Sequence, residues 1–148
     1  MTKIIHPVAG ALALLTIATF WLSTAASELL ASHAVVTTVK TAIPWGFLLL
    51  VPALAAAGGS GFALAKGRRA GPIGAKIRRM PLIAANGILI LIPCALFLAF
   101  KARAAEFDTA FYAVQALELF AGAANVTLLG LNMRDGLMMK GFLRRQTA

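Results

Sequence analysis

The stretch IIHPVAGALALLTIATFWLSTAASELL (residues 4–30) decides the fold class, because it is long, apolar and carries one acidic side chain, Glu28, close to its end. A helix needs roughly 20 apolar residues to cross the hydrocarbon core of a bilayer. Similar stretches follow at about 42–65, 81–100 and 111–132. They lack the alternation of apolar and polar residues that is typical of membrane barrels. We therefore predict an all-α integral membrane protein, a bundle of four transmembrane helices.

The composition agrees with a bundle that faces lipid. Hydrophobic residues make up 60% of the 148 residues and charged residues 13%, whereas soluble domains are roughly one quarter charged. We expect one transmembrane domain over residues 1–148 and no water-soluble domain. The net charge is +9, but the cations flank apolar spans, as is typical of membrane topology and anionic headgroups. The predicted partner is the lipid bilayer, not nucleic acid.

The basic residues predict the orientation. Most of the 14 Lys and Arg residues lie near the N-terminus, in the predicted loop KGRRAGPIGAKIRRM (66–80), or between residues 134 and 145. Because the chain is expected to cross the membrane four times, these three segments lie on the same side of the membrane. Lys40, Lys101 and Arg103 fall in short loops on the other side, at about 31–41 and 101–110. The positive-inside rule then predicts cytoplasmic termini and two antiparallel helical hairpins.

Four prolines lie in the second and third predicted spans. Pro44 and Pro81 are expected at or near helix starts, where a missing N–H has little cost. Pro52 and Pro93 lie inside spans, where we expect them to kink the second and third helices.

The fourth span carries a polar seam. Its members recur at alternating three- and four-residue spacing, which places them on one helical face: Gln115, Glu118, Gly122, Asn125, Leu129 and Asn132. Polar groups are costly in lipid, so this face should look into the bundle. Two interpretations stay open, a proton or cation relay centred on Glu118, or hydrogen bonds that hold the bundle or a dimer together. Asn86 in the third span is a candidate partner for either.

His6 is the candidate metal ligand. Gly10, four residues on, lies on the same helical face and would leave room for a flat macrocycle, and haem iron accepts His or a His/Met pair. Met133 and two later methionines follow the fourth span on the same side of the membrane, so Met133 is the candidate second ligand. The alternative is that His6 is an interfacial polar residue. His33 is about 40 Å away along a continuous helix and cannot share a metal ion with it.

The segment I-I-H-P-V-A-G-A-L-A-L-L (4–15) is similar to the first helix of small four-helix b-type cytochromes. That resemblance implies haem b as cofactor and electron transfer as function. The later spans depart from the family pattern, because they contain no histidine, whereas such cytochromes usually place several on facing helices. The chain also resembles short four-helix inner-membrane proteins of alphaproteobacteria, in the segments H-P-V-A-G (6–10) and L-N-M-R-D-G-L (131–137). This resemblance implies the bacterial inner membrane as the location and implies no activity.

Three classes of function remain open. The first is a haem-b electron carrier, with quinone as an exchange partner. The second is an accessory or assembly subunit in a homo-oligomer or larger membrane complex, for which the small residues Ala121, Gly122 and Ala124 would provide a packing surface. The third is a small oligomeric transporter or channel that uses Glu118. Hydrolase, P-loop and dinucleotide motifs do not occur in the sequence, so an enzymatic activity is left undecided.

Overall fold

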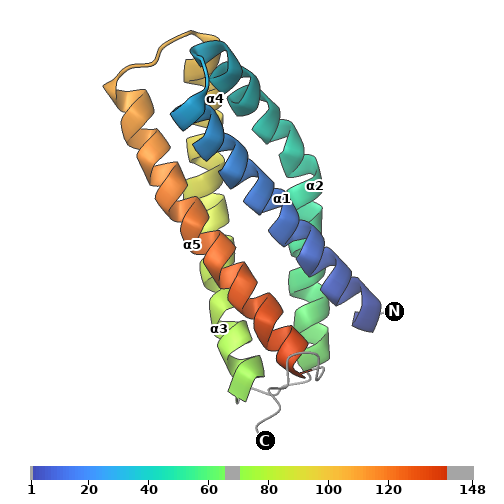
Figure 1. Ribbon diagram of the computed structural model, residues 1–148. Helices are drawn as coiled ribbons and strands as arrows, with labels where there is room; N and C mark the ends of the chain where they lie inside the picture. The colour runs from blue at the N-terminus through green and yellow to red at the C-terminus, as the bar shows by residue number, and fades with distance from the viewer. Residues whose placement is uncertain (1, 66–70, 140–148) are drawn as a thin grey trace, which may run out of the picture.

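The computed structural model describes residues 2–65 and 71–139. In this part of the chain four helical rods lie side by side (Figure 1). The bounds are α1 Thr2–Leu30, α2 His33–Ala65, a continuous third rod of α3 Gly71–Asn86, η1 Gly87–Leu91 and α4 Ile92–Arg103, and α5 Thr109–Met139. Each rod is long and apolar enough to cross a membrane. The prediction of an all-α four-helix membrane bundle is confirmed.

The rods alternate in direction, so that α1 begins and α5 ends at the same end of the bundle (Figure 1). We call this the terminal end. The connections 31–32 and 104–108 lie at the opposite end, the turn end. The helix α1 packs along both α2 and α5, and α3 packs on α5, whereas α2 and α3 meet at few points. The two halves of the bundle are therefore joined mainly through α1, α4 and α5.

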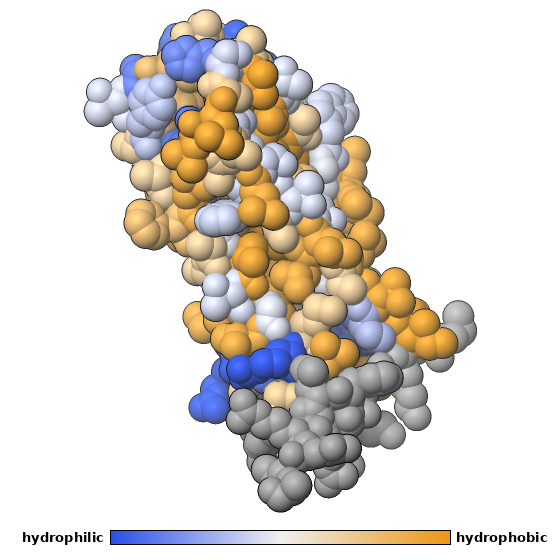
Figure 2. Space-filling model, in the orientation of Figure 1, coloured by the Kyte–Doolittle hydropathy of each residue, from blue (hydrophilic) through white to orange (hydrophobic). Residues whose placement is uncertain are grey.

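Large apolar side chains cover the outside of the rods. Figure 2 shows hydrophobic residues over the middle of the visible face and the most hydrophilic ones toward its ends. Leu48, Phe120 and Leu89 are each at least 70% exposed. A soluble protein would not leave so large an apolar surface in water. The chain is a multi-pass membrane protein whose lipid-facing side chains point outward.

The helix α2 begins at His33, nine residues before the predicted start at about 42, so the predicted loop 31–41 is wrong. Threonines make this segment look polar in sequence. Their hydroxyls donate back to carbonyl oxygens four residues earlier, from Thr37 to His33 at 2.9 Å and from Thr38 to Ala34 at 3.0 Å. A hydroxyl bonded in this way does not interrupt a membrane helix.

The third rod also begins earlier than predicted, at Gly71 instead of about 81. Residues 71–80 of the predicted basic loop 66–80 are helical, and residues 66–70 lie outside the described part. Arg79 donates a hydrogen bond to Asp135 of α5 at 2.7 Å, which holds this basic turn of helix in the bundle. The fourth rod extends beyond the predicted 111–132 at both ends. Six predicted cytoplasmic cations lie outside the described residues: Lys66, Arg68, Arg69, Lys140, Arg144 and Arg145.

Prolines inside the rods are accommodated locally. Pro44 and Pro81 lie within α2 and α3, so their predicted place at helix starts is wrong. Before Pro93 the backbone widens into the π-helical turn η1, where the N–H of Ile92 bonds to the carbonyl of Gly87, five residues earlier. Proline supplies no N–H to the helical ladder, and a π turn is a common way to absorb the disruption.

Two apolar clusters form the core. The larger one lies in the middle of the bundle and is built from Ala13, Ile17, Leu50, Ala53, Ile83 and Leu129. The smaller one lies at the turn end and is built from Val36, Leu98, Ala102 and Phe111. The groups that carry chemistry lie beside and between these clusters.

Candidate functional site

The polar seam of α5 is buried. Gln115, Glu118, Asn125 and Asn132 are all between 1% and 9% exposed. The seam continues one turn further to Asp135, which is 8% exposed. Side chains of this kind need partners when they leave water. The partners come from α2 and from the third rod, and they divide the seam into three parts.

At the turn-end part of the seam, Glu118 forms an ion pair with Lys40 of α2. The ammonium Nζ lies 2.5 Å from the carboxylate Oε2, and the Lys40 side chain is fully buried. Thr24 of α1 accepts a weaker hydrogen bond from the same ammonium at 3.5 Å, and Gln115 donates to Glu118 at 3.5 Å. An ion pair enclosed by three helices is thus part of the membrane-spanning bundle.

Lys40 was predicted to lie in a loop, which is wrong, because it lies within α2. The polar residues around Lys40 suggest a loop, whereas its spacing from buried residues of α2 indicates an inward-facing position. Val36, Lys40 and Ile43 recur at four- and three-residue spacing on the face of α2 that packs inward, and all three are buried. A helical-face analysis that started from the buried residues of α2 would have included Lys40.

In the middle of the bundle, two asparagines join the third and fourth rods. Asn86 donates through Nδ2 to the Asn125 side-chain oxygen and to the carbonyl of Ala121, each at 2.8 Å. Asn125 in turn donates to the carbonyl of Ile83 at 3.4 Å. The partner of Asn86 is therefore Asn125, and this pair acts as interhelical hydrogen bonding of the kind that fixes membrane helices together.

A small residue of α5 makes close packing possible inside the chain. A Cβ on Gly122 would lie 2.7 Å from the indole Cδ1 of Trp21. The same indole donates through Nε1 to the carbonyl of Leu119 at 2.8 Å. Ala121 is also buried. At these two positions the predicted small-residue surface packs against other rods of the same chain, and Ala124 alone of the three predicted residues is exposed.

At the terminal end, Asp135 and Asn132 bind α3. The guanidinium of Arg79 donates to Asp135 at 2.7 Å and to the Asn132 oxygen at 3.4 Å. Arg134 adds a longer ion pair with Asp135, 3.3 Å. Asn132 donates to the sulfur of Met80 at 3.5 Å. This group closes the terminal end of the α3–α5 contact.

His6 lies against α2. Its Nδ1 is 3.0 Å from the carbonyl oxygen of Ala57 and 3.3 Å from the hydroxyl of Ser60. The ring packs on Gly61 so closely that a Cβ there would lie 2.9 Å from the His6 Cε1. A carbonyl oxygen only accepts, so Nδ1 carries the proton. The hydrogen bond and the glycine fix the orientation of the imidazole.

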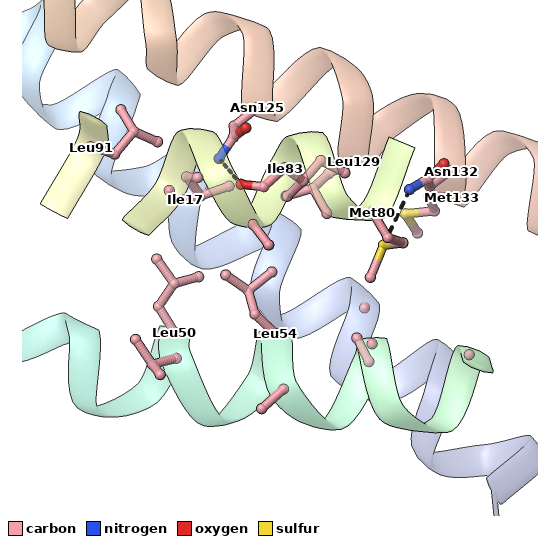
Figure 3. Close-up of a pocket in the computed structure, with 18 of the residues that line it drawn as sticks. Ile17, Leu50, Leu54, Met80, Ile83, Leu91, Asn125, Leu129, Asn132 and Met133 are labelled. Carbon is pink, nitrogen blue, oxygen red and sulfur yellow. Dashed lines mark hydrogen bonds between the residues drawn. The ribbon is translucent and has the colours of Figure 1, made fainter. Parts of the chain in front are cut away.

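A cavity of about 1050 Å³ separates α2 from α3 along the middle and terminal end of the bundle. Most of its wall is apolar: Figure 3 shows Leu50 and Leu54 of α2 on one side and Ile83 and Leu129 on the other. A few polar groups interrupt the wall, and all of the predicted cofactor residues line it. The residues relevant to chemistry are His6, Gly10, Met80, Glu118, Asn125, Asn132 and Met133.

Four features of the lining bear on the predicted haem group. The volume is at the upper end of the range for small-molecule and cofactor sites. The wall offers an imidazole and a thioether, the donors that haem iron accepts. A Cβ on Gly10 would meet no described atom within 4 Å, so this glycine faces open space, as a residue beside a flat macrocycle must. Lys76 also lines the cavity and supplies a cation for a carboxylate.

His33 is separate from this site. It lies at the turn end, where its ring stacks on Phe107 with a centroid distance of 4.1 Å and its Nε2 is 3.4 Å from the hydroxyl of Tyr112. Within residues 2–65 and 71–139, no three His, Cys, Asp or Glu side chains gather as a metal site. Cys94 is buried.

No protein-family model matches the chain, and comparisons with curated proteins and with solved structures give no match. The function must therefore be argued from the residues of the cavity and the ion pair.

Proposed function

We propose that the cavity binds haem b, with His6 as an axial ligand, and that the protein is a membrane electron-transfer component. Haem supplies one-electron chemistry when it is bound. The chain would supply the ligand, a largely apolar pocket and a cation. Only residues that line the cavity take part in this function, and none of them acts as a catalytic group.

The hydrogen bond between His6 and the carbonyl of Ala57 is the observation that carries this proposal. Histidines that bind metal usually donate their other ring N–H to a carbonyl or carboxylate, which fixes the tautomer and the ring orientation. His6 makes this bond at 3.0 Å on the wall of the cavity. In a neutral imidazole with its proton on Nδ1, Nε2 would be the atom that binds iron.

Met133 is the better candidate for a second ligand. Two methionine sulfurs belong to the cavity wall, Met80 and Met133, and both are visible in Figure 3. The Met80 sulfur already accepts a hydrogen bond from Asn132 at 3.5 Å. The Met133 side chain belongs to a residue that is 43% exposed, which leaves it room to change rotamer. A His/Met pair would favour the reduced iron relative to two histidines.

Absorption spectra of the purified protein, oxidised and dithionite-reduced, test the proposal. We expect a Soret band and sharp reduced α and β bands in the wild type. His6→Ala should lose them while its far-ultraviolet circular dichroism stays helical. His33→Ala is the matched control and should keep the wild-type spectrum. A haem-replete preparation with protein absorbance alone would refute the proposal.

We propose quinone as the electron partner. The cavity wall is almost entirely apolar, and α2 and α3, which flank the cavity, meet at few points; this suits a lipid-soluble redox carrier more than a charged one. Reduced haem that is reoxidised by a short-chain quinone, with His6→Ala as the haem-free control, would support this assignment. Reoxidation at the rate of the control would contradict it.

An oligomer or a larger membrane complex remains the second proposal. Ala55, Gly59 and Ala63 lie four residues apart on α2 and are all exposed. Small residues at this spacing allow two membrane helices to approach closely. Gly59→Leu should shift the detergent-corrected mass toward the monomer if this face pairs with another chain. An unchanged mass would remove it as the interface.

We also propose an inner-membrane location with the terminal end in the cytoplasm. The described cations Lys76, Arg78, Arg79 and Arg134 belong to the terminal end, and Lys101 and Arg103 to the turn end. Lys40 is buried, so it no longer counts as a loop cation, and the bias toward the terminal end becomes stronger. A reporter enzyme that is active only outside the cytoplasm should stay inactive when it is fused after Ala148.

A further inference from the structure

We infer that Glu28, Lys40 and Glu118 form a proton path that leads from the turn end of the bundle into the cavity. This inference does not depend on haem. Its evidence is the ion pair, the unpaired oxygens of Glu28 and Gln115 and the extent of the cavity, and it needs no ligand bound at His6. A failure of the haem proposal would therefore leave it standing, and the reverse also holds.

The ion pair is the middle step of the path. Lys40 lies seven residues into α2 and Glu118 nine residues into α5, counted from the turn end. At 1.5 Å per residue, both lie roughly 10–14 Å along their helices. A lysine at this depth is costly and rare in a membrane helix, and such residues usually mark ion or proton pathways.

Glu28 is the entrance. It lies two residues before the end of α1 and one helical turn from Thr24, the residue that accepts a hydrogen bond from Lys40. Its charge interacts with that of Lys40. One carboxyl oxygen, Oε1, is buried and has no hydrogen-bond partner among the described residues. Glu28 thus lies between the turn end and the buried ammonium.

Gln115 gives independent evidence for a water position. It is 4% exposed, and its Oε1 also has no hydrogen-bond partner in the described part of the chain. Its amide nitrogen meanwhile donates to Glu118. Buried acceptors without a protein partner are normally satisfied by water. Water at the unpaired oxygens of Gln115 and Glu28 would connect the two carboxylates and the ammonium by hydrogen bonds.

The cavity provides the exit. Glu118, Asn125 and Asn132 are spaced seven residues apart on α5, and all three line it. The cavity wall extends as far as Lys76 and Gly136, which belong to the first turns of α3 and the last turns of α5. A proton released by Glu118 therefore enters a space that reaches the terminal end.

The proposed transfer balances in three steps. The Lys40 ammonium passes one proton to the Glu118 carboxylate, which gives a neutral amine and a carboxylic acid. Glu28, protonated by a hydronium ion at the turn end, which becomes water, returns a proton to the amine. Glu118 then gives its proton to water in the cavity. One proton has moved, and each of the three side chains has regained its starting charge.

Three other titratable side chains act on the Lys40 ammonium, from three different rods: Glu28, Cys94 and Glu118. His33 interacts with Glu28 at the entrance. Cys94 lies on α4, which packs against α2. The path does not use this thiol, so Cys94→Ser should leave proton movement unchanged.

Proton uptake by proteoliposomes tests the path. A potassium diffusion potential, set with valinomycin, drives protons across vesicles that contain a pH-sensitive dye. We expect uptake above that of protein-free vesicles for the wild type. Glu28→Gln should reduce it to the protein-free level, because the amide keeps the shape of the side chain but cannot carry the proton. Glu106→Gln, the same substitution on an exposed glutamate near the turn end, is the matched control and should leave uptake unchanged.

The double variant Lys40→Met/Glu118→Leu separates transport from folding. It replaces the buried ion pair by apolar side chains of similar volume, a change that usually preserves the fold. It should remain folded and show no uptake above protein-free vesicles. Wild-type uptake equal to that of protein-free vesicles would overturn the inference. Full uptake by the folded double variant would also overturn it and would leave the ion pair with a structural role alone.

Discussion

Two lysines near the turn end form ion pairs in opposite surroundings. Lys40 binds Glu118 with both side chains almost removed from solvent, at 0% and 11% exposure. Lys101 binds Glu106 at 2.6 Å and Asp108 at 2.8 Å, and both of these carboxylates are about half exposed, at 53% and 51%. The distances are similar, so distance alone does not tell what each pair does.

Exposure to solvent decides how much each ion pair contributes to stability. An exposed pair exchanges its partners for water at little cost, and contributes little to stability. A buried pair has no such exchange, so the loss of one partner leaves an uncompensated charge. The exposed pair ties down the connection 104–108, whereas the buried pair connects α2 to α5 in the interior. Removal of single partners should therefore separate the two pairs clearly.

The largest effect is expected from Lys40→Met. Glu118 would be left buried with Gln115 as its nearest donor, and we expect the free energy of unfolding to fall by about 3–5 kcal/mol. Denaturant titration in detergent, followed by circular dichroism, measures the change. Lys101→Met is the matched control, with an expected midpoint close to the wild type. Equal loss in both variants would contradict the distinction between the pairs.

A smaller effect of opposite sign is expected when both buried partners are replaced. Lys40→Met/Glu118→Leu should be as stable as the wild type or more stable, by up to about 4 kcal/mol, because no charge is left unpaired. The same titration decides this. If the double variant is as unstable as Lys40→Met alone, the cost comes from packing and not from the loss of charge compensation.

The smallest effect concerns pH and the exposed pair. The hydrogen bond from Lys101 lowers the pKa of Asp108 below its usual value. The resulting stabilisation is present above the unfolded pKa of about 4 and is lost as the pH falls through the lower, folded pKa. Asp108 also accepts the N–H of Phe111 at the start of α5. Asp108→Asn should keep that cap and weaken the acid dependence of the unfolding midpoint. An unchanged acid dependence would exclude Asp108 as its source.

The sequence predicts the fold well and the site in part. Apolar stretches of sufficient length indicate a membrane helix without reference to the rest of the chain, which is why the four rods were found. The three- and four-residue spacing along α5 likewise identifies the side chains that the structure buries. Helix ends were predicted too short, because threonines and arginines lower hydropathy even when they are bonded within the bundle.

Partners across the bundle could not be predicted. Lys40 and Glu118 are 78 residues apart and His6 and Ala57 are 51 apart, and no local pattern relates residues at such separations. The register of α2 against α1 and α5 decides these contacts. Asn86 was predicted to be a polar partner of the seam, but its choice of Asn125 over Glu118 again depends on how α3 packs on α5.

The central claim is that Lys40 and Glu118 are paired inside the membrane. Solid-state NMR of the protein in lipid bilayers tests it most directly, through the dipolar coupling between ¹⁵Nζ of lysine and ¹³Cδ of glutamate. Lys40→Met would identify the Lys40 signal. We predict a strong coupling that disappears in Lys40→Met and in Glu118→Gln but persists in Glu106→Gln. A Lys40 signal without coupling to any glutamate carboxyl would contradict the ion pair and the proton path built on it.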